Sequence, residues 1–256
     1  KVLLLTLPSF YADFEGKRNR DSDYKRVSDD VRNLLRDAAD ADVAGLILDL
    51  RGNGGGSLEE AIDVAGLFFP RGPVVQVRDS RGKKRVHRDN DPDTLYHGPM
   101  IVLVDHLSAS ASEIVSAALQ DYGRAVVIGE SSTHGKGTVQ TVLGLNRFFQ
   151  RHPVYKNREA GSLKFTIAKF YRVNGGSVQR KGVIPDITFP SFNEYMELGE
   201  ASLEHALRWD QIEPLDVGWE HDVRPYVDVL KERSDERLAK SEAFDERKEA
   251  IERFSE

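Results

Sequence analysis

The sequence predicts an α/β fold in which a largely parallel sheet is flanked by helices. Short apolar runs, each about as long as one buried strand, alternate along the chain with segments whose apolar residues recur every three or four positions. Parallel strands are joined by helical crossovers and bury both faces, so this alternation favours a parallel sheet covered by helices.

Each element of that sheet follows from its own pattern. Apolar runs predict strands at residues 2–7, 43–50, 100–104 and 125–128. Helical spacing predicts helices at residues 24–38, 58–69 and 111–119.

A second set of strands is predicted outside the parallel sheet. Residues 74–88 alternate around a turn at Arg81 and Gly82, which indicates a β-hairpin. Further strands are expected over residues 162–171 and 176–187.

Composition changes after Pro190. The segment that follows is rich in helix formers, and residues 231–256 mix nine acidic with seven basic side chains. We therefore expect a core domain at residues 1–190 and a helical C-terminal extension at residues 191–256.

Charge and composition exclude several function classes. The 36 basic and 42 acidic side chains give a net charge of −6. A negative net charge does not attract the phosphate backbone, so nucleic-acid binding is not expected. The absence of cysteine excludes disulfides, thiolate nucleophiles and iron–sulfur clusters. The apolar stretch at residues 2–5 is too short to span a membrane, so stable membrane insertion is not expected. Because the chain begins with Lys1, we expect it to be part of a longer protein.

A glycine-rich segment, Asp-Leu-Arg-Gly-Asn-Gly-Gly-Gly, occupies residues 49–56. It lies at the carboxyl end of a predicted buried strand, where α/β sheets bind their ligands. Glycines there allow backbone N–H groups to turn toward a bound oxygen, as in an anion nest or an oxyanion hole. A loop that only turns the chain is the alternative. The spacing does not fit a dinucleotide fingerprint.

A serine-rich segment, Ser-Ala-Ser-Ala-Ser-Glu, occupies residues 108–113 at the start of a predicted helix. Ser110 and Glu113 have the spacing of a capping box, and that structural role alone would explain both residues. The same position suits a nucleophile, since the helix dipole and the free N–H groups favour developing negative charge. Both interpretations remain open at this point.

A third segment, Gly-Lys-Gly-Thr-Val-Gln, occupies residues 135–140. It is not a phosphate loop, because Gly137 stands where the hydroxyl residue should follow the lysine. His106 and His134 lie close in sequence to the second and third segments, but no histidine spacing indicates zinc, and we interpret both as surface or hydrogen-bonded residues.

Together, in their order and separation, the three segments resemble the carboxyl-terminal processing proteases, also called tail-specific proteases. The similarity continues through residues 120–125, 169–176 and 179–186 and covers residues 1–190. The helical tail is similar to the extension of the larger periplasmic members in Gram-negative bacteria. The resemblance implies a crotonase-like serine protease core and a periplasmic location.

The resemblance also implies a role for individual residues. Ser110 corresponds to the nucleophile, Lys136 to the general base and Gln140 to the residue that supports the lysine. The backbone N–H groups of Gly56 and Ala111 correspond to the oxyanion hole. No metal and no organic cofactor is implied. A glutamine amide can orient the lysine amine without the added charge that would hold its proton in place.

Two features depart from the family pattern. The connection at residues 131–134 is one residue longer than usual, with His134 where an aromatic residue is commoner. Family members also carry a peptide-binding PDZ domain ahead of the region matched here, and we expect that domain to lie outside this chain.

We therefore expect a serine endopeptidase that uses a Ser110–Lys136 dyad to cut proteins or peptides near their C-termini through an acyl-enzyme. Its expected partners are polypeptides with accessible C-termini, and an adaptor protein is a further candidate partner. The sequence does not indicate an oligomeric state. One alternative is a non-catalytic peptide-binding scaffold on the same fold. Another is a phosphate or nucleotide binder that uses the glycine loops.

Overall fold

The computed structural model describes residues 1–39, 41, 43–149, 159–218 and 222–255. Its centre is a five-stranded sheet in which every neighbouring pair of strands is parallel. In spatial order the strands are β1 (Val2–Thr6), β2 (Gly45–Asp49), β5 (Met100–Val104), β6 (Val126–Gly129) and β9 (Ile187–Thr188). The four predicted strands are confirmed, with ends that lie within two residues of those expected.

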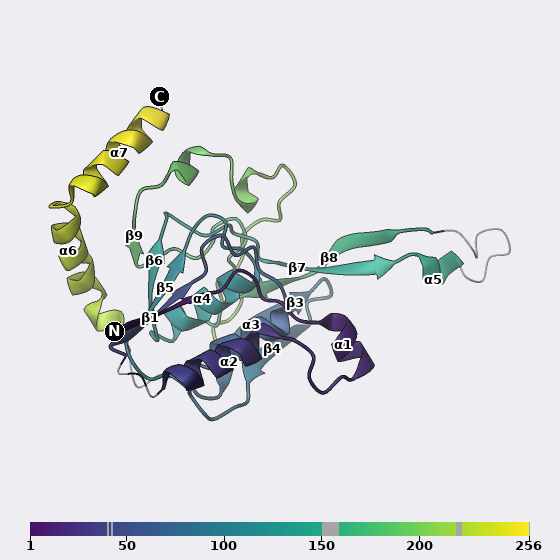
Figure 1. The fold of residues 1–256 in the computed structure, drawn as a ribbon. Coiled ribbons are helices and arrows are strands. Elements are labelled where there is room, and N and C mark those ends of the chain that lie inside the picture. Colours follow the sequence, from purple (N-terminus) through teal and green to yellow (C-terminus); the bar gives the residue numbers. More distant parts are fainter. Residues whose placement is uncertain (40, 42, 150–158, 219–221, 256) are drawn as a thin grey trace.

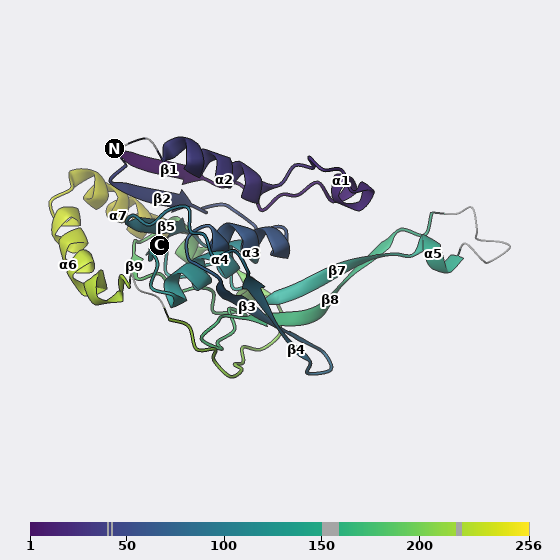
Figure 2. The same cartoon turned by 90° about the horizontal axis from the view of Figure 1, so that it is seen from below.

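Three helices connect these strands and lie side by side (Figures 1 and 2). They are α2 (Val27–Ala38), α3 (Leu58–Gly66) and α4 (Ala111–Asp121). All three predicted helices are confirmed, with ends displaced by at most three residues. Because successive crossovers step across the sheet in one direction, the right-handed rule places these helices on one face.

The hydrophobic core fills the space between the parallel sheet and these helices. Its fully buried side chains come from both layers: Leu46, Leu48, Val102 and Val127 from strands, and Ala61, Val64, Val115 and Leu119 from helices. Residues 111–119 of α4 are all buried, so the helix that follows Ser110 is held on every side. A helix so enclosed is a rigid support for its first turn.

A second, antiparallel sheet packs beside α3 and α4, and its strand order is β4-β3-β8-β7. The strands are β3 (Gly72–Asp79), β4 (Lys84–Asp89), β7 (Thr138–Gly144) and β8 (Ser162–Tyr171). The predicted hairpin is β3–β4, and its turn is closed by a hydrogen bond from the Gly82 N–H to the Asp79 carbonyl (3.0 Å). Strands β7 and β8 extend away from the rest of the molecule toward the short helix α5 (Asn146–Phe149) (Figure 2).

The sequence prediction was wrong at several elements. Of the strand expected over residues 176–187, only Ile187 lies in a strand, because Arg180 (φ 64°) and Gly182 (φ 68°) adopt left-handed conformations that interrupt a pleated strand. Helix α1 (Phe14–Asn19) and strand β7 were not predicted. Helix α1 is capped by Asp13, whose carboxylate accepts hydrogen bonds from two N–H groups of the first turn.

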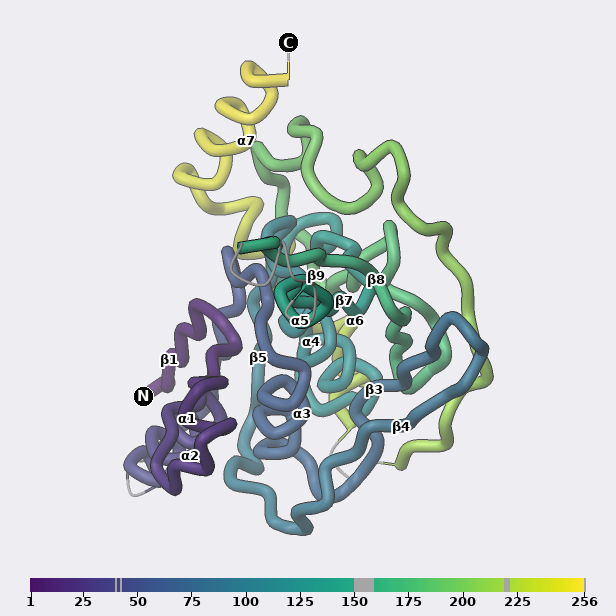
Figure 3. Tube along the Cα trace, turned by 90° about the vertical axis from the view of Figure 1, so that its right-hand side faces the viewer, coloured from purple at the N-terminus to yellow at the C-terminus, as the bar shows by residue number. Residues whose placement is uncertain are grey.

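In the described residues of the C-terminal extension, the α-helices are α6 (Val227–Leu238), which follows the 3-10 turn η3 (Arg224–Tyr226), and α7 (Glu242–Ser255). Before them come the 3-10 turns η1 (Phe192–Tyr195) and η2 (Glu200–Ser202), and then a stretch without helix up to residue 218. Figure 3 shows this stretch, in yellow-green, running along the same side of the molecule as β3 and β4. No described helix is both long enough and apolar enough to cross a membrane.

Candidate active site

The three motif segments meet at one edge of the parallel sheet. The first segment begins at Asp49, the last residue of β2. The second begins in the connection after β5, and the third begins in the connection between β6 and β7. Strands β2, β5 and β6 are parallel neighbours, so their carboxyl ends lie at the same edge, where α/β sheets bind ligands.

Asn53 joins the glycine loop to the turn before α4. Its side chain is fully buried, donates to the Leu7 carbonyl (2.8 Å) and accepts from the Gly55 N–H (2.9 Å). Its carbonyl accepts from the Ala109 N–H (3.0 Å) and from the Ser112 hydroxyl (2.7 Å). The two segments are therefore fixed against each other.

The three serines of residues 108–113 have different surroundings. Ser108 and Ser112 are fully buried, and their hydroxyls donate to the carbonyls of Leu50 (2.9 Å) and Asn53 (2.7 Å). Ser110 is partly exposed and has φ 57° and ψ −107°, a conformation that non-glycine residues rarely adopt. Strain of this kind is stored where the surroundings over-determine the backbone, and it is common at reactive residues. Of the three serines, Ser110 is thus the one available for chemistry.

The glycine loop lies directly beside Ser110. A Cβ atom on Gly55 would come within 2.9 Å of the Ser110 Cβ and 3.0 Å of the Ala111 nitrogen. A Cβ atom on Gly56 would come within 2.2 Å of the Phe10 carbonyl oxygen. Both glycines also have positive φ, so no other residue fits at either position without displacing the backbone.

Glu113 connects the Ser110 turn to the loop that carries Lys136. Its carboxylate is fully buried, and Oε2 accepts hydrogen bonds from the backbone N–H groups of Ser110 (2.7 Å) and Lys136 (3.0 Å). Oε1 accepts from the Thr133 hydroxyl (2.7 Å) and the Gly135 N–H (2.7 Å). The bond to Ser110 is the one that the capping-box spacing predicts. The other three hold the lysine loop against the start of α4.

Burial raises the pKa of Glu113 to about 7, while its hydrogen bonds with Thr133, Ser110, Gly135 and Lys136 oppose that rise. Three of these partners are backbone N–H groups, which can only donate, and the ionised carboxylate is the form that accepts from all three and from the Thr133 hydroxyl together. The ionised form of Glu113 is therefore the one that matches the observed arrangement.

Replacing Glu113 with glutamine is expected to damage both stability and activity. The new amide NH₂ must face two donors, and each buried donor left unpaired costs roughly 1–3 kcal/mol. We expect the melting temperature of Glu113→Gln to fall by several degrees and its peptide-cleavage rate to fall at least about tenfold.

Thermal melting and cleavage of an unstructured protein measure both effects. The exposed carboxylate Glu194, changed to glutamine in the same way, is the matched control and should change neither. A Glu113→Gln variant with wild-type melting temperature and rate would contradict the role of the carboxylate as a joint between the two loops.

Lys136 lies two residues before β7 and lines a pocket of about 400 Å³. Gln140, four residues further on, lines the same pocket, as do Leu203 and Leu207 of the C-terminal extension. Lys136 is partly buried, and within the described part of the chain its ammonium group has no hydrogen-bond or ion-pair partner. The structure thus places Lys136 and Gln140 in the wall of one pocket. The loop that carries Lys136 is joined to the Ser110 turn by Glu113.

Comparison with known families agrees with this geometry. Residues 1–189 match the model of peptidase family S41, and residues 193–256 match that of the C-terminal domain of tail-specific protease. The chain belongs to peptidase family S41.

Relatives of this S41 chain carry related names. It is 41% identical over 246 residues to the tail-specific protease of Haemophilus influenzae, covering 95% of this chain and 33% of the relative. It is 38% identical over 174 residues to the carboxy-terminal-processing protease of Bartonella bacilliformis, covering 65% of this chain and 37% of the relative. The chain therefore spans about a third of the length of these curated relatives.

A solved structure of a photosystem II D1 C-terminal processing protease has a similar fold. The match has a TM-score of 0.58 and 28% identity, and it covers 73% of this chain and 42% of that one. The observed α/β core with its separate antiparallel sheet is thus the architecture of an S41 peptidase.

The two histidines near the motifs of this S41 chain have partners of their own. The His106 Nε2 lies 3.2 Å from the Ser131 hydroxyl, and the His134 Nε2 lies 4.0 Å from Glu200 Oε2. Burial lowers the pKa of His134. Within the described residues, no group of three His, Cys, Asp or Glu side chains is placed to hold a metal ion.

Sequence reasoning missed three residues that shape the site of this S41 chain. Asn53 was treated only as part of the glycine run, Glu113 only as a helix cap, and Glu200 not at all. Each acts through contacts with residues far away in the sequence. Asn53, for example, forms hydrogen bonds with Leu7, 46 positions before it, and with Ser112, 59 positions after it. Local spacing carries no signal for such contacts.

Proposed function

We propose that this chain is the catalytic part of a serine endopeptidase with Ser110 as nucleophile and Lys136 as general base. The observation that carries the proposal is the shared anchor: one buried carboxylate, Glu113, holds both the strained Ser110 turn and the Lys136 loop. A joint of this kind is what a two-residue catalytic unit requires, since a misplacement of about 1 Å can cost about 100-fold in rate.

In the proposed reaction the neutral Lys136 amine removes the Ser110 hydroxyl proton as Oγ attacks the scissile carbonyl carbon. The tetrahedral oxyanion accepts hydrogen bonds from the N–H groups of Gly56 and Ala111. Collapse of this intermediate breaks the C–N bond, and the leaving amine takes the proton from Lys136. The neutral Lys136 amine then takes a proton from water, which attacks the ester carbonyl carbon. The C–O bond to Ser110 breaks, and Lys136 returns the proton to Oγ.

Gln140 supports this cycle from the wall of the lysine pocket. Its amide oxygen can accept a hydrogen bond from the amine and orient it toward Ser110. Because the amide is uncharged, it does not stabilise the ammonium form as a carboxylate would. Gln140 is therefore assigned to positioning the base.

The proposed substrates are proteins or peptides with accessible C-termini. This follows the names of the relatives, which include tail-specific, carboxy-terminal-processing and D1 C-terminal processing proteases. We further propose a periplasmic location, a division into a core at residues 1–190 and an extension at residues 191–256, and delivery of some substrates by an adaptor protein.

Digestion of β-casein, an unstructured protein, by the full-length protein tests this function. We expect internal peptide bonds to be cut, with fragments that identify the positions of cleavage by mass spectrometry. We also expect no loss of rate with EDTA or thiol reagents, because the proposed dyad uses neither a metal nor a thiol. Binding of casein without cleavage would instead support a peptide-binding scaffold, and inhibition by EDTA that zinc reverses would contradict the dyad.

A further inference from the structure

The loop that carries Lys136 is held on a second side by Glu200 of the C-terminal extension. The Glu200 N–H donates to the His134 carbonyl (2.8 Å), and its Oε1 accepts from the Gln179 side-chain amide (2.9 Å). The Gln179 Oε1 in turn accepts from the Gly137 N–H (2.9 Å). Glu200 is therefore linked to the loop on both sides of Lys136, directly to His134, two residues before it, and through Gln179 to Gly137 after it.

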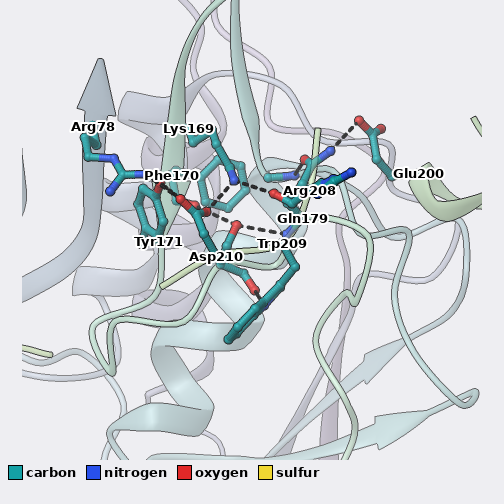
Figure 4. Close-up of polar contacts among 11 residues, drawn as sticks. Arg78, Lys169, Phe170, Tyr171, Gln179, Glu200, Arg208, Trp209 and Asp210 are labelled. Carbon is teal, nitrogen blue, oxygen red and sulfur yellow. Dashed lines mark hydrogen bonds and ion pairs between the residues drawn. The ribbon is translucent and has the colours of Figure 1, made fainter. Parts of the chain in front are cut away.

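The orientation of the Gln179 amide depends on Glu200. Gln179 is fully buried, and Figure 4 shows its side chain directed at the Glu200 carboxylate. A carboxylate only accepts hydrogen bonds, so it fixes the NH₂ of Gln179 on its own side and leaves the carbonyl oxygen for Gly137. Without Glu200 the buried NH₂ of Gln179 would lose its acceptor, and within this chain of bonds only the Gly137 N–H would hold the amide in its orientation.

Close packing leaves the Lys136 loop little room to adjust. A Cβ atom on Gly137 would come within 2.7 Å of the backbone nitrogen of Gln179. A Cβ atom on Gly135 would come within 3.0 Å of the Arg180 backbone, whose N–H donates to the Gly135 carbonyl (2.7 Å). A shift of Gln179 is therefore transmitted to the loop.

The segment that follows Glu200 is itself anchored to β8. Lys169 donates to the Arg208 carbonyl (2.7 Å) and forms an ion pair with Asp210, as does Arg78 (Figure 4). The Trp209 indole donates to the Ser177 carbonyl (2.7 Å). These contacts hold the extension in place where Leu203 and Leu207 form one wall of the lysine pocket.

We propose that Glu200 is a positioning residue for the peptidase reaction, and that the C-terminal extension thereby completes the active site of the core. Glu200 fixes the orientation of the Gln179 side-chain amide, and that amide fixes the position of the Gly137 backbone. The position of Gly137 in turn determines where the neighbouring Lys136 directs its amine. The proposal rests on the dyad mechanism proposed above.

An exchange of donor and acceptor tests this role. Gln179→Glu alone places two carboxylates together and is expected to lower kcat at least about tenfold with KM changed less than about twofold. The double variant Gln179→Glu, Glu200→Gln inverts the bond, since the amide introduced at position 200 donates to the carboxylate introduced at position 179. The other oxygen of that carboxylate still accepts from the Gly137 N–H. We expect the double variant to recover most of kcat.

Variants at Glu200 alone give an independent readout. Glu200→Ala is expected to lose about tenfold in kcat, whereas Glu200→Gln retains an acceptor for Gln179 and should stay within about threefold of wild type. Glu197→Gln, on an exposed residue of the same segment, is the control and should match wild type. Melting temperatures measured in parallel identify any variant that fails to fold.

The outcomes separate the two proposals. Wild-type kcat in Glu200→Ala, or a double variant no more active than Gln179→Glu alone, would overturn the role of Glu200 while Ser110-dependent cleavage persisted. Cleavage that continues in Ser110→Ala would overturn the dyad mechanism itself.

Discussion

Ser110→Ala should abolish peptide hydrolysis while leaving the fold nearly intact. The variant lacks the attacking oxygen, so we expect the cleavage rate of the full-length protein to fall by about 10³-fold or more. The loss of a helix-capping side chain costs only about 1 kcal/mol. Alanine also keeps the backbone N–H that donates to Glu113. Circular dichroism and thermal melting, together with a casein-cleavage assay, measure both effects.

Ser108→Ala and Ser112→Ala are the matched controls. Ser112→Ala removes one buried hydrogen bond, to the Asn53 carbonyl, and should lower stability by roughly 1 kcal/mol. Ser108→Ala removes the bond to the Leu50 carbonyl and the one accepted from the Asp105 N–H, so its loss of stability should be larger. Both should keep substantial activity, because neither hydroxyl is available to a substrate. If Ser112→Ala were inactive and Ser110→Ala active, the nucleophile would be wrongly assigned.

Lys136→Arg should be as inactive as Ser110→Ala although it keeps the positive charge. A guanidinium group does not release its proton near neutral pH and so cannot take one from Ser110. The fold should persist, because the bond to Glu113 is made by the backbone N–H at this position. The measurement is the rate of acylation by an ester or peptide substrate across a range of pH.

Lys164→Arg is the control, since Lys164 is an exposed lysine of β8 and the same substitution there should leave the rate unchanged. Robust turnover by Lys136→Arg would remove Lys136 from the mechanism. The search for a base would then turn to His106 and His134.

The parallel sheet and its helices could be predicted because their patterns are local. An apolar run such as residues 100–104 matches β5 end for end. Residues 176–187 were harder, because Val178 and Val183 are buried in the hydrophobic core without forming a pleated strand. The left-handed residues Arg180 and Gly182 lie in this stretch, and the Gly182 backbone passes so close to Thr133 that a side chain would not fit.

The positions of the motifs could also be predicted, because parallel neighbouring strands end at one edge of a sheet. How the motifs are held together could not. Glu113 accepts from groups 20 to 23 residues away, and Glu200 acts through Gln179 on Gly137, 63 residues away in sequence. The distances that decide a catalytic site are set by tertiary contacts of this kind.

Site-specific labelling with a fluorophosphonate tests the central claim most directly, because this reagent reacts preferentially with an activated serine hydroxyl. We expect intact-mass analysis of the full-length protein to give one adduct, mapped by peptide sequencing to Ser110. Labelling should be absent in Ser110→Ala and slowed at least about 100-fold in Lys136→Arg. An adduct on another residue, or wild-type labelling of Ser110 in Lys136→Arg, would contradict a Ser110–Lys136 dyad.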